Sequence, residues 1–135
     1  DASEVVPFIN SSDKEDYLVV PSWFRKTQPY QQNQIKHFMI AFMNGIKGND
    51  QEKIIASEYI GYEVRRQESA GAHYLDINVD EIHYDLEIQK QAMKWVVSTV
   101  ESYSSVPLCI DSSNSEIIHT GLSEYTGKSG PPIIN

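Results

Sequence analysis

Polar side chains stand at the ends of three apolar segments in the second half of the chain. They are Asp76, Asn78, Asp111 and Asn135. If the apolar segments are parallel strands, their carboxyl ends meet at one rim, which is where parallel α/β proteins bind ligands. The residues that could carry chemistry are therefore expected to form one pocket.

Carboxylates combined with carboxamides suit a planar heterocycle. An Asp can accept hydrogen bonds from a ring N–H and an adjacent amino group, and an Asn can donate and accept at once. The 2-amino-4-oxo-pyrimidine edge of a pterin or of guanine has this arrangement. The alternative is that Asp76 and Asp111 only cap the helices that follow them, because a helix N-terminus attracts negative charge. Repetition at three strand ends favours the shared pocket.

Other motifs indicate no chemistry. The sequence T-G-K-S at 126–129 is similar to the end of a phosphate-binding loop, but Leu122 occupies the position of its first glycine and a helix precedes it. The four histidines lack the spacing of metal ligands, and Cys109, the single cysteine, is too few for a disulfide or a Cys-based zinc site. No metal is expected, and no catalytic residue is identified.

The composition is that of a folded, acidic domain. The chain has 135 residues, of which 40% are hydrophobic and 22% charged, and this suits one globular unit. Its net charge of −8 disfavours a nucleic-acid partner. No apolar segment approaches the roughly 20 residues that span a bilayer, and residues 1–4 are acidic where a signal peptide is basic. We expect a cytoplasmic protein without a membrane partner.

Hydrophobic periodicity predicts the elements that position the polar residues. The first half contains a short apolar run at 5–9, a loop at 10–16, a first strand at 17–20, and amphipathic helices at 31–48 and 50–71. The second half contains strands at 74–79, 106–110 and from 132, a helix at 86–103, and a helix that begins at a capping box in 113–116. This alternation predicts right-handed crossovers and a parallel sheet.

Three motifs in this order resemble those of the pterin-binding superfamily. They read GAHYLDINVDE at 71–81, PLCIDSSN at 107–114 and PIIN at 132–135. The resemblance covers residues 50–135. It is closest to the methyltetrahydrofolate:corrinoid methyltransferases and the folate domain of cobalamin-dependent methionine synthase, and the dihydropteroate synthases share the fold.

The resemblance implies a fold as well as a family. The α/β class is expected to take the form of the N-terminal half of a (β/α)₈ TIM-type barrel, with parallel strands and crossover helices. A complete barrel takes about 250 residues. Residues 50–135 are therefore expected to be a partial pterin-binding barrel domain that stops at its fourth strand. Residues 1–49 are expected to be an N-terminal extension with the first strand and a helix.

The resemblance also implies roles for the site residues. Asp111 corresponds to the carboxylate that binds the pterin ring, Asn135 to an Asn that contacts it, and Asp76 and Asn78 to the pair that shapes the same pocket. Two further residues, Ser112 and Asn114, are expected to support that pocket from behind. The implied reaction moves the N5 methyl of methyltetrahydrofolate to the cobalt of cobalamin or a related corrinoid, which a partner protein or domain carries.

Two alternatives stay open. The family's first strand ends in a G-E-R-I-N-like segment, which VVPSWFR at 19–25 does not match, and only half of a barrel is present. The chain could instead be a non-catalytic half-barrel that binds a partner or forms a homo-oligomer through its open strand edges. It could also be similar to dihydropteroate synthase, although the Arg and Lys residues needed for a diphosphate leaving group do not follow these motifs. The segment alone is expected to be inactive and to self-associate.

Overall fold

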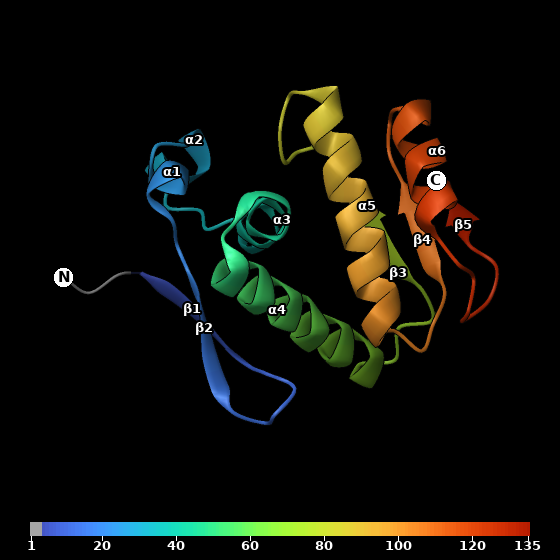
Figure 1. The fold of residues 1–135 in the computed structure, drawn as a ribbon, viewed down its shortest axis with the longest axis horizontal. Coiled ribbons are helices and arrows are strands. Elements are labelled where there is room, and N and C mark those ends of the chain that lie inside the picture. The colour runs from blue at the N-terminus through green and yellow to red at the C-terminus, as the bar shows by residue number, and fades with distance from the viewer. Residues whose placement is uncertain (1–3) are drawn as a thin grey trace.

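A three-stranded parallel sheet occupies the second half of the chain in the computed structural model, which describes residues 4–135 (Figure 1). Its strands, in spatial order, are β3 (Leu75–Asn78), β4 (Leu108–Asp111) and β5 (Ile133–Ile134). The helices α5 (Leu86–Tyr103) and α6 (Ser115–Glu124) connect them. The predicted α/β class and parallel pairing are confirmed, and the three strands fit part of a (β/α)₈ barrel.

A separate antiparallel hairpin forms the N-terminal part. It consists of β1 (Val5–Ile9) and β2 (Glu15–Val19), with Val5 opposite Val19 and Ile9 opposite Glu15. The loop predicted at 10–16 ends earlier, at residue 14, and the strand predicted at 17–20 is part of β2 but belongs to this hairpin and not to the barrel. The five residues 10–14 that join β1 to β2 are too few for the crossover that parallel strands require, so the two strands pair antiparallel. Within residues 4–135, the parallel sheet has three strands and not the expected four.

Four helices link the hairpin to the parallel sheet. They are α1 (Ser22–Arg25), α2 (Gln28–Gln31), α3 (His37–Lys47) and α4 (Asp50–Ser69). The helix predicted from residue 31 begins later, at His37, because Asn33 has a left-handed φ of 61° that a right-handed helix cannot include. The start of α4 agrees with the prediction, since Asn49 and Glu52 form a capping box with hydrogen bonds of 2.8 and 2.9 Å.

The helix α5 lies at the centre of the helical layer (Figure 1). Glycines allow its neighbours to approach closely. A Cβ on Gly45 of α3 would lie 2.3 Å from the Trp95 ring, and one on Gly61 of α4 would lie 2.6 Å from the Tyr103 ring. Side chains at these two positions would push α3 and α4 away from α5. The close approach packs α3 and α4 against α5, which in turn contacts β3.

The parallel sheet has a covered face and an open face. Four apolar side chains, Leu75, Ile77, Leu108 and Ile110, are buried at 4% exposure or less, and Ile110 contacts the α6 surface at Gly121. Successive side chains of a strand point to opposite faces. The alternation therefore places Asp76 and Asn78 on the open face, where both are exposed. The covered face supplies the core, and the open face is available to a ligand.

The start of α6 differs from the prediction by one residue. The capping box expected at 113–116 does not form, because the Ser113 N–H donates to the Asp80 carboxylate over 2.8 Å. Asn114 is the N-cap instead, and its Oδ1 accepts from the Glu116 N–H over 2.8 Å.

No helix in residues 4–135 is long and apolar enough to cross a membrane. The expectation that the N-terminus is not a signal peptide was based on the acidic residues 1–4. Residues 1–3 of this segment lie outside the described part of the chain.

Candidate functional site

The carboxyl ends of the three parallel strands bring the predicted site residues to one rim. Asn78 and Asp111 are register partners at the ends of β3 and β4. Asn135 extends the pairing past β5, since its N–H donates to the Ile110 carbonyl over 3.0 Å and its own carbonyl accepts from the Ser112 N–H over 3.1 Å. The structure therefore places residues from all three strands along one edge of the sheet.

Asp76 lies two residues before this edge, opposite Cys109. Partial desolvation is the largest influence on Asp76 and raises its pKa; the Cys109 thiol acts in the opposite direction, and the neighbouring Asp111 carboxyl adds to the rise. Burial also raises the pKa of the Cys109 thiol to about 11, with further contributions from Asp76 and Asp111. Two carboxyl groups thus share a small space, which favours a ligand that presents N–H donors.

Asp80 joins the loops that follow β3 and β4. Its Oδ1 accepts from the Ser112 hydroxyl over 2.6 Å, and its Oδ2 accepts from the Ser113 N–H over 2.8 Å. The Ser112 hydroxyl oxygen in turn accepts from the Asn114 N–H over 3.0 Å. Ser112 and Asn114 therefore lie behind the rim and hold its backbone, and Asn114 also caps α6.

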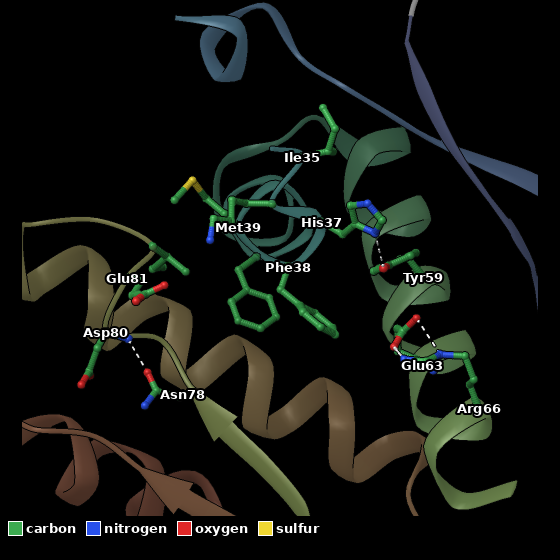
Figure 2. A pocket seen from close by; sticks show the side chains of 13 residues that line it. Ile35, His37, Phe38, Met39, Tyr59, Glu63, Arg66, Asn78, Asp80 and Glu81 are labelled. Atoms are coloured by element: carbon green, nitrogen blue, oxygen red, sulfur yellow. Dashed lines mark hydrogen bonds and ion pairs between the residues drawn. The ribbon is translucent and has the colours of Figure 1, made fainter. Parts of the chain in front are cut away.

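A cleft of about 670 Å³ opens beside the rim (Figure 2). Its walls are the N-terminal part of α3, the middle of α4, and residues 78–82 after β3. A smaller hollow of about 180 Å³ continues along β3 and is lined by both Asp76 and Asn78. In Figure 2, Phe38 points into the cleft between α4 and Asn78. The polar rim and the aromatic cleft are therefore continuous through Asn78.

The α4 wall of the cleft carries two polar pairs. Arg66 binds the buried Glu63 carboxylate, with Nη2 to Oε2 at 2.7 Å, and His37 Nδ1 lies 3.2 Å from the Tyr59 hydroxyl. Burial raises the pKa of Tyr59 far above its ordinary value, and the Glu63 charge adds to the rise. Tyr59 therefore stays a neutral phenol. Within each pair the two polar groups bind each other. This wall of the cleft is therefore of mixed polarity and is not strongly charged.

The segment that is similar to a phosphate-binding loop has a structural role. The buried Glu101 carboxylate accepts from the Thr126 N–H over 2.8 Å, from the Thr126 hydroxyl over 2.9 Å and from the Gly127 N–H over 3.2 Å. The donors that would bind a phosphate are thus already occupied by a carboxylate. The segment is the turn from α6 to β5, in agreement with the sequence interpretation.

Sequence reasoning missed two parts of this site. Asp80 lies within the motif at 71–81, but the sequence assigns it no role, because its partners Ser112 and Ser113 are more than thirty residues away at separations of 32 and 33. The cleft wall formed by α3 and α4 could not be predicted from the sequence. Hydrophobic periodicity identifies the buried face of a helix but not a cleft beside it. In residues 4–135, no group of three or more His, Cys, Asp or Glu is arranged to hold a metal ion.

A parallel α/β sheet with a polar ligand rim at its carboxyl ends defines a class of small-molecule-binding proteins. The family model described as pterin binding enzyme matches residues 41–135, from within α3 to the end of β5, so the chain belongs to the pterin-binding enzyme family. The family resemblance of the three motifs is thereby confirmed. No solved structure matches the chain.

Proposed function

We propose that this chain supplies the pterin-binding rim of a methyltetrahydrofolate-dependent methyltransferase whose methyl acceptor is a corrinoid on a partner protein or domain. The single observation that supports this most is the rim itself, where three neighbouring parallel strands bring together Asp76 and Asn78 of β3, Asp111 at the end of β4 and Asn135 after β5. The L-D-I-N-V sequence at 75–79 favours the methyltransferase branch of the family over the dihydropteroate synthases.

The residues at the rim fit a pterin. In this proposal, Asp111 accepts hydrogen bonds from the ring N3–H and the 2-amino group, and Asp76 lies beside it below the rim. N–H donors between two neighbouring carboxyl groups would relieve the unfavourable interaction that raises the pKa of Asp76. Asn78 and Asn135 then contact the remaining polar atoms of the heterocycle.

The chemistry requires a proton at the pterin. A tertiary amine is a poor leaving group, so N5 must gain a proton as its bond to the methyl group breaks. The corrinoid supplies the cobalt that accepts the methyl group. This chain's part is to bind and orient the ring so that N5 and its methyl face the open side of the sheet.

An open sheet also supports the expectation of self-association. β3 and β5 each pair with only one strand within residues 4–135, and Ile133 and Ile134 are 41% and 56% exposed. Exposed strand edges and apolar side chains pair readily with another chain. A homo-oligomer formed through these edges is the second function that we propose, and it is compatible with the first.

Calorimetric titration of the intact protein with methyltetrahydrofolate tests the first proposal. Asp111→Asn is expected to weaken binding by about 1.5–3 kcal/mol, the scale of a hydrogen bond to a charged group. Glu124→Gln removes an exposed carboxylate at the end of α6 and serves as the control. Equal affinity in wild type and Asp111→Asn would refute the assignment. Transfer of the methyl group to cob(I)alamin, followed by absorbance, tests the reaction itself.

A further inference from the structure

Asp80 is the residue through which the ends of all three parallel strands are connected. Its carboxylate binds Ser112 and Ser113 on the loop after β4, at 2.6 and 2.8 Å. Ser112 also donates its backbone N–H to the carbonyl of Asn135, at the end of β5. Asp80 itself follows β3 by two residues. One side chain therefore fixes the spacing between the loops that carry the rim.

The same residue determines the orientation of Asn78. The Asp80 backbone N–H donates to Asn78 Oδ1 over 2.8 Å, a bond drawn in Figure 2. An N–H can only donate, so the carboxamide must turn its oxygen toward Asp80 and its Nδ2 away from it. Asn78 therefore presents an NH₂ donor, and not an acceptor, to the open face of the sheet.

Asp80 holds this arrangement as a carboxylate. Partial burial is the largest influence on Asp80 and by itself raises its pKa, but the hydrogen bonds from Ser112 and Ser113 together bring the pKa below its ordinary value. Both oxygens of the side chain are occupied by donors from the β4 loop. Each oxygen thus already accepts a hydrogen bond within the protein, and the effect of Asp80 on a ligand that we consider acts through Asn78.

We infer that Asp80 is a positioning and specificity-determining residue, which locks Asn78 as a hydrogen-bond donor and so selects 4-oxo pterins over 4-amino pteridines. A 4-oxo group accepts the hydrogen bond from Asn78 Nδ2. A 4-amino group at the same place presents a second donor opposite Asn78 Nδ2, so this hydrogen bond is lost. A 4-amino pteridine also lacks the N3–H that Asp111 accepts, but this loss is the same in every Asp80 variant, so the change in the affinity ratio reports on Asn78. This inference rests on the proposed pterin site and assigns to it a rule for ligand choice.

The test compares two ligands across three proteins. Affinities of 6-methyltetrahydropterin and its 4-amino analogue are measured by calorimetry for wild type, Asp80→Ala and Asp85→Asn. Asp85 is an acidic residue in the same loop that caps α5 through the Glu87 N–H and makes no hydrogen bond to the β4 loop in residues 4–135, so it is the matched control. Asp80→Ala keeps the backbone N–H that binds Asn78 Oδ1 but releases the loop after β3 from the β4 loop. That N–H is then held less firmly, and the Asn78 amide can rotate and present its oxygen.

The expected result is a change in the affinity ratio. Wild type and Asp85→Asn should favour the 4-oxo ligand by at least about tenfold, the value of one hydrogen bond, and Asp80→Ala should reduce that preference about tenfold. Asp80→Asn, which keeps one acceptor oxygen, should fall between them. A lesion that only destabilises the fold would weaken both ligands together. An unchanged ratio in Asp80→Ala would overturn the inference.

A ligand-free measurement separates this inference from the proposed function. The side-chain amide signals of Asn78 in ¹H–¹⁵N spectra should shift in Asp80→Ala and stay in place in Asp85→Asn. If wild type binds neither ligand, the pterin site is refuted, and the inferred selection with it, while a shift of the Asn78 signals would still show that Asp80 positions this side chain. Identical Asn78 signals in Asp80→Ala and wild type would overturn the positioning role whatever the ligands do.

Discussion

The two sheets of this molecule each leave one face open, and the two open faces are opposite in character. The outer face of the β1–β2 hairpin carries Val5, Ile9, Tyr17 and Val19, each between 41% and 47% exposed. The open face of the parallel sheet carries Asp76 and Asn78, with Asp111 at the same edge. The first is suited to packing against another apolar surface, and the second to binding a polar ligand.

The hairpin and the parallel sheet also differ in how they are attached. The parallel sheet shares its core with α5 and α6, whereas the hairpin packs on α4 through its inner face (Figure 1). Polar bonds at its turn join it to the same helix: Glu58 accepts from the Ser11 N–H and hydroxyl, and Arg65 donates to the Ile9 carbonyl. The family match begins at residue 41, after the hairpin. The family model therefore covers the parallel sheet and leaves the hairpin outside, and we propose that the hairpin is an addition to the unit that binds the ligand.

The same substitution in each sheet gives the largest expected effect. Leu108 of β4 and Leu18 of β2 are both fully buried. Leu108→Ala should lower the free energy of global unfolding by about 2–5 kcal/mol, because a buried cavity is left in the shared core. Leu18→Ala should act mainly on the local opening of the hairpin.

Urea denaturation measures the free energy of global unfolding, and native-state hydrogen exchange measures the protection of each sheet separately. Protection in β4 should fall strongly in Leu108→Ala and little in Leu18→Ala, while protection in β1 and β2 should fall in both. Equal loss of β4 protection in the two variants would show that the sheets unfold as one unit, and the comparison would fail.

The next largest effect on stability is expected at Glu101, a buried carboxylate that anchors the turn before β5 and has no counterpart in the hairpin. Glu101→Ala removes the acceptor of three donors at Thr126 and Gly127, in the turn that leads to β5. We expect a loss of about 2–3 kcal/mol in the free energy of unfolding, because three partly buried hydrogen bonds to a charged acceptor are lost. Glu101→Gln keeps one acceptor oxygen and should lose less. Thermal unfolding by circular dichroism measures both, and equal stability of Glu101→Ala and wild type would contradict the anchor.

The parallel half of the fold could be predicted because its signals are local. The helix at 86–103 begins and ends where its periodicity does, and the strand ends that bear Asp76 and Asp111 follow from apolar runs. The hairpin could not be read in this way, since Val5–Ile9 is interrupted by Pro7 and pairs through a polar turn. The length of that turn was the physical constraint that would have decided the pairing.

The candidate site was predictable in its residues but not in its connections. Alternation along β3 and the register with β4 place Asn78 beside Asp111, and both rules operate on sequence. The bonds from Asp80 to Ser112 and Ser113 span more than thirty residues, at separations of 32 and 33, and no periodic pattern encodes them. The cleft beside Phe38 depends on how α3 packs on α4 and α5, which only tertiary structure determines.

A smaller effect, in opposite directions, is expected for two carboxylates of the rim. The folded-state pKa of Asp76 is raised above its ordinary 3.8, so its charge at neutral pH opposes folding, and that cost disappears as the pH falls below 3.8. Asp76→Asn should therefore raise stability at pH 7 and have no effect near pH 3. The pKa of Asp80 is lowered, so Asp80→Asn should reduce stability at pH 7, with the loss fading as the pH falls through the lowered folded-state value.

Melting temperatures of the two variants and of wild type, measured from pH 3 to pH 7, test these signs. A stabilising Asp76→Asn at neutral pH would mark Asp76 as a residue kept for binding at a cost in stability. If both variants lower stability at pH 7, Asp76 and Asp80 both stabilise the fold. The contrast between a carboxylate kept for binding and one that supports the rim would then be wrong.

The smallest effect is expected where the hairpin turn meets α4. Glu58→Ala removes an acceptor that binds the Ser11 N–H over 2.9 Å and its hydroxyl over 2.7 Å. Because these bonds are exposed to water, which replaces them, the free energy of global unfolding should change by less than about 1 kcal/mol. Amide exchange at Ser11 and its neighbours should nevertheless become faster, while exchange in β4 and affinity for methyltetrahydrofolate should stay at wild-type values. Glu58→Gln retains one acceptor oxygen and should restore most of the local protection, which separates loss of the hydrogen bonds from loss of charge. A fall in ligand affinity with Glu58→Ala would show that the hairpin supports the binding rim through α4, and the division of the molecule into a binding unit and an added hairpin would have to be abandoned.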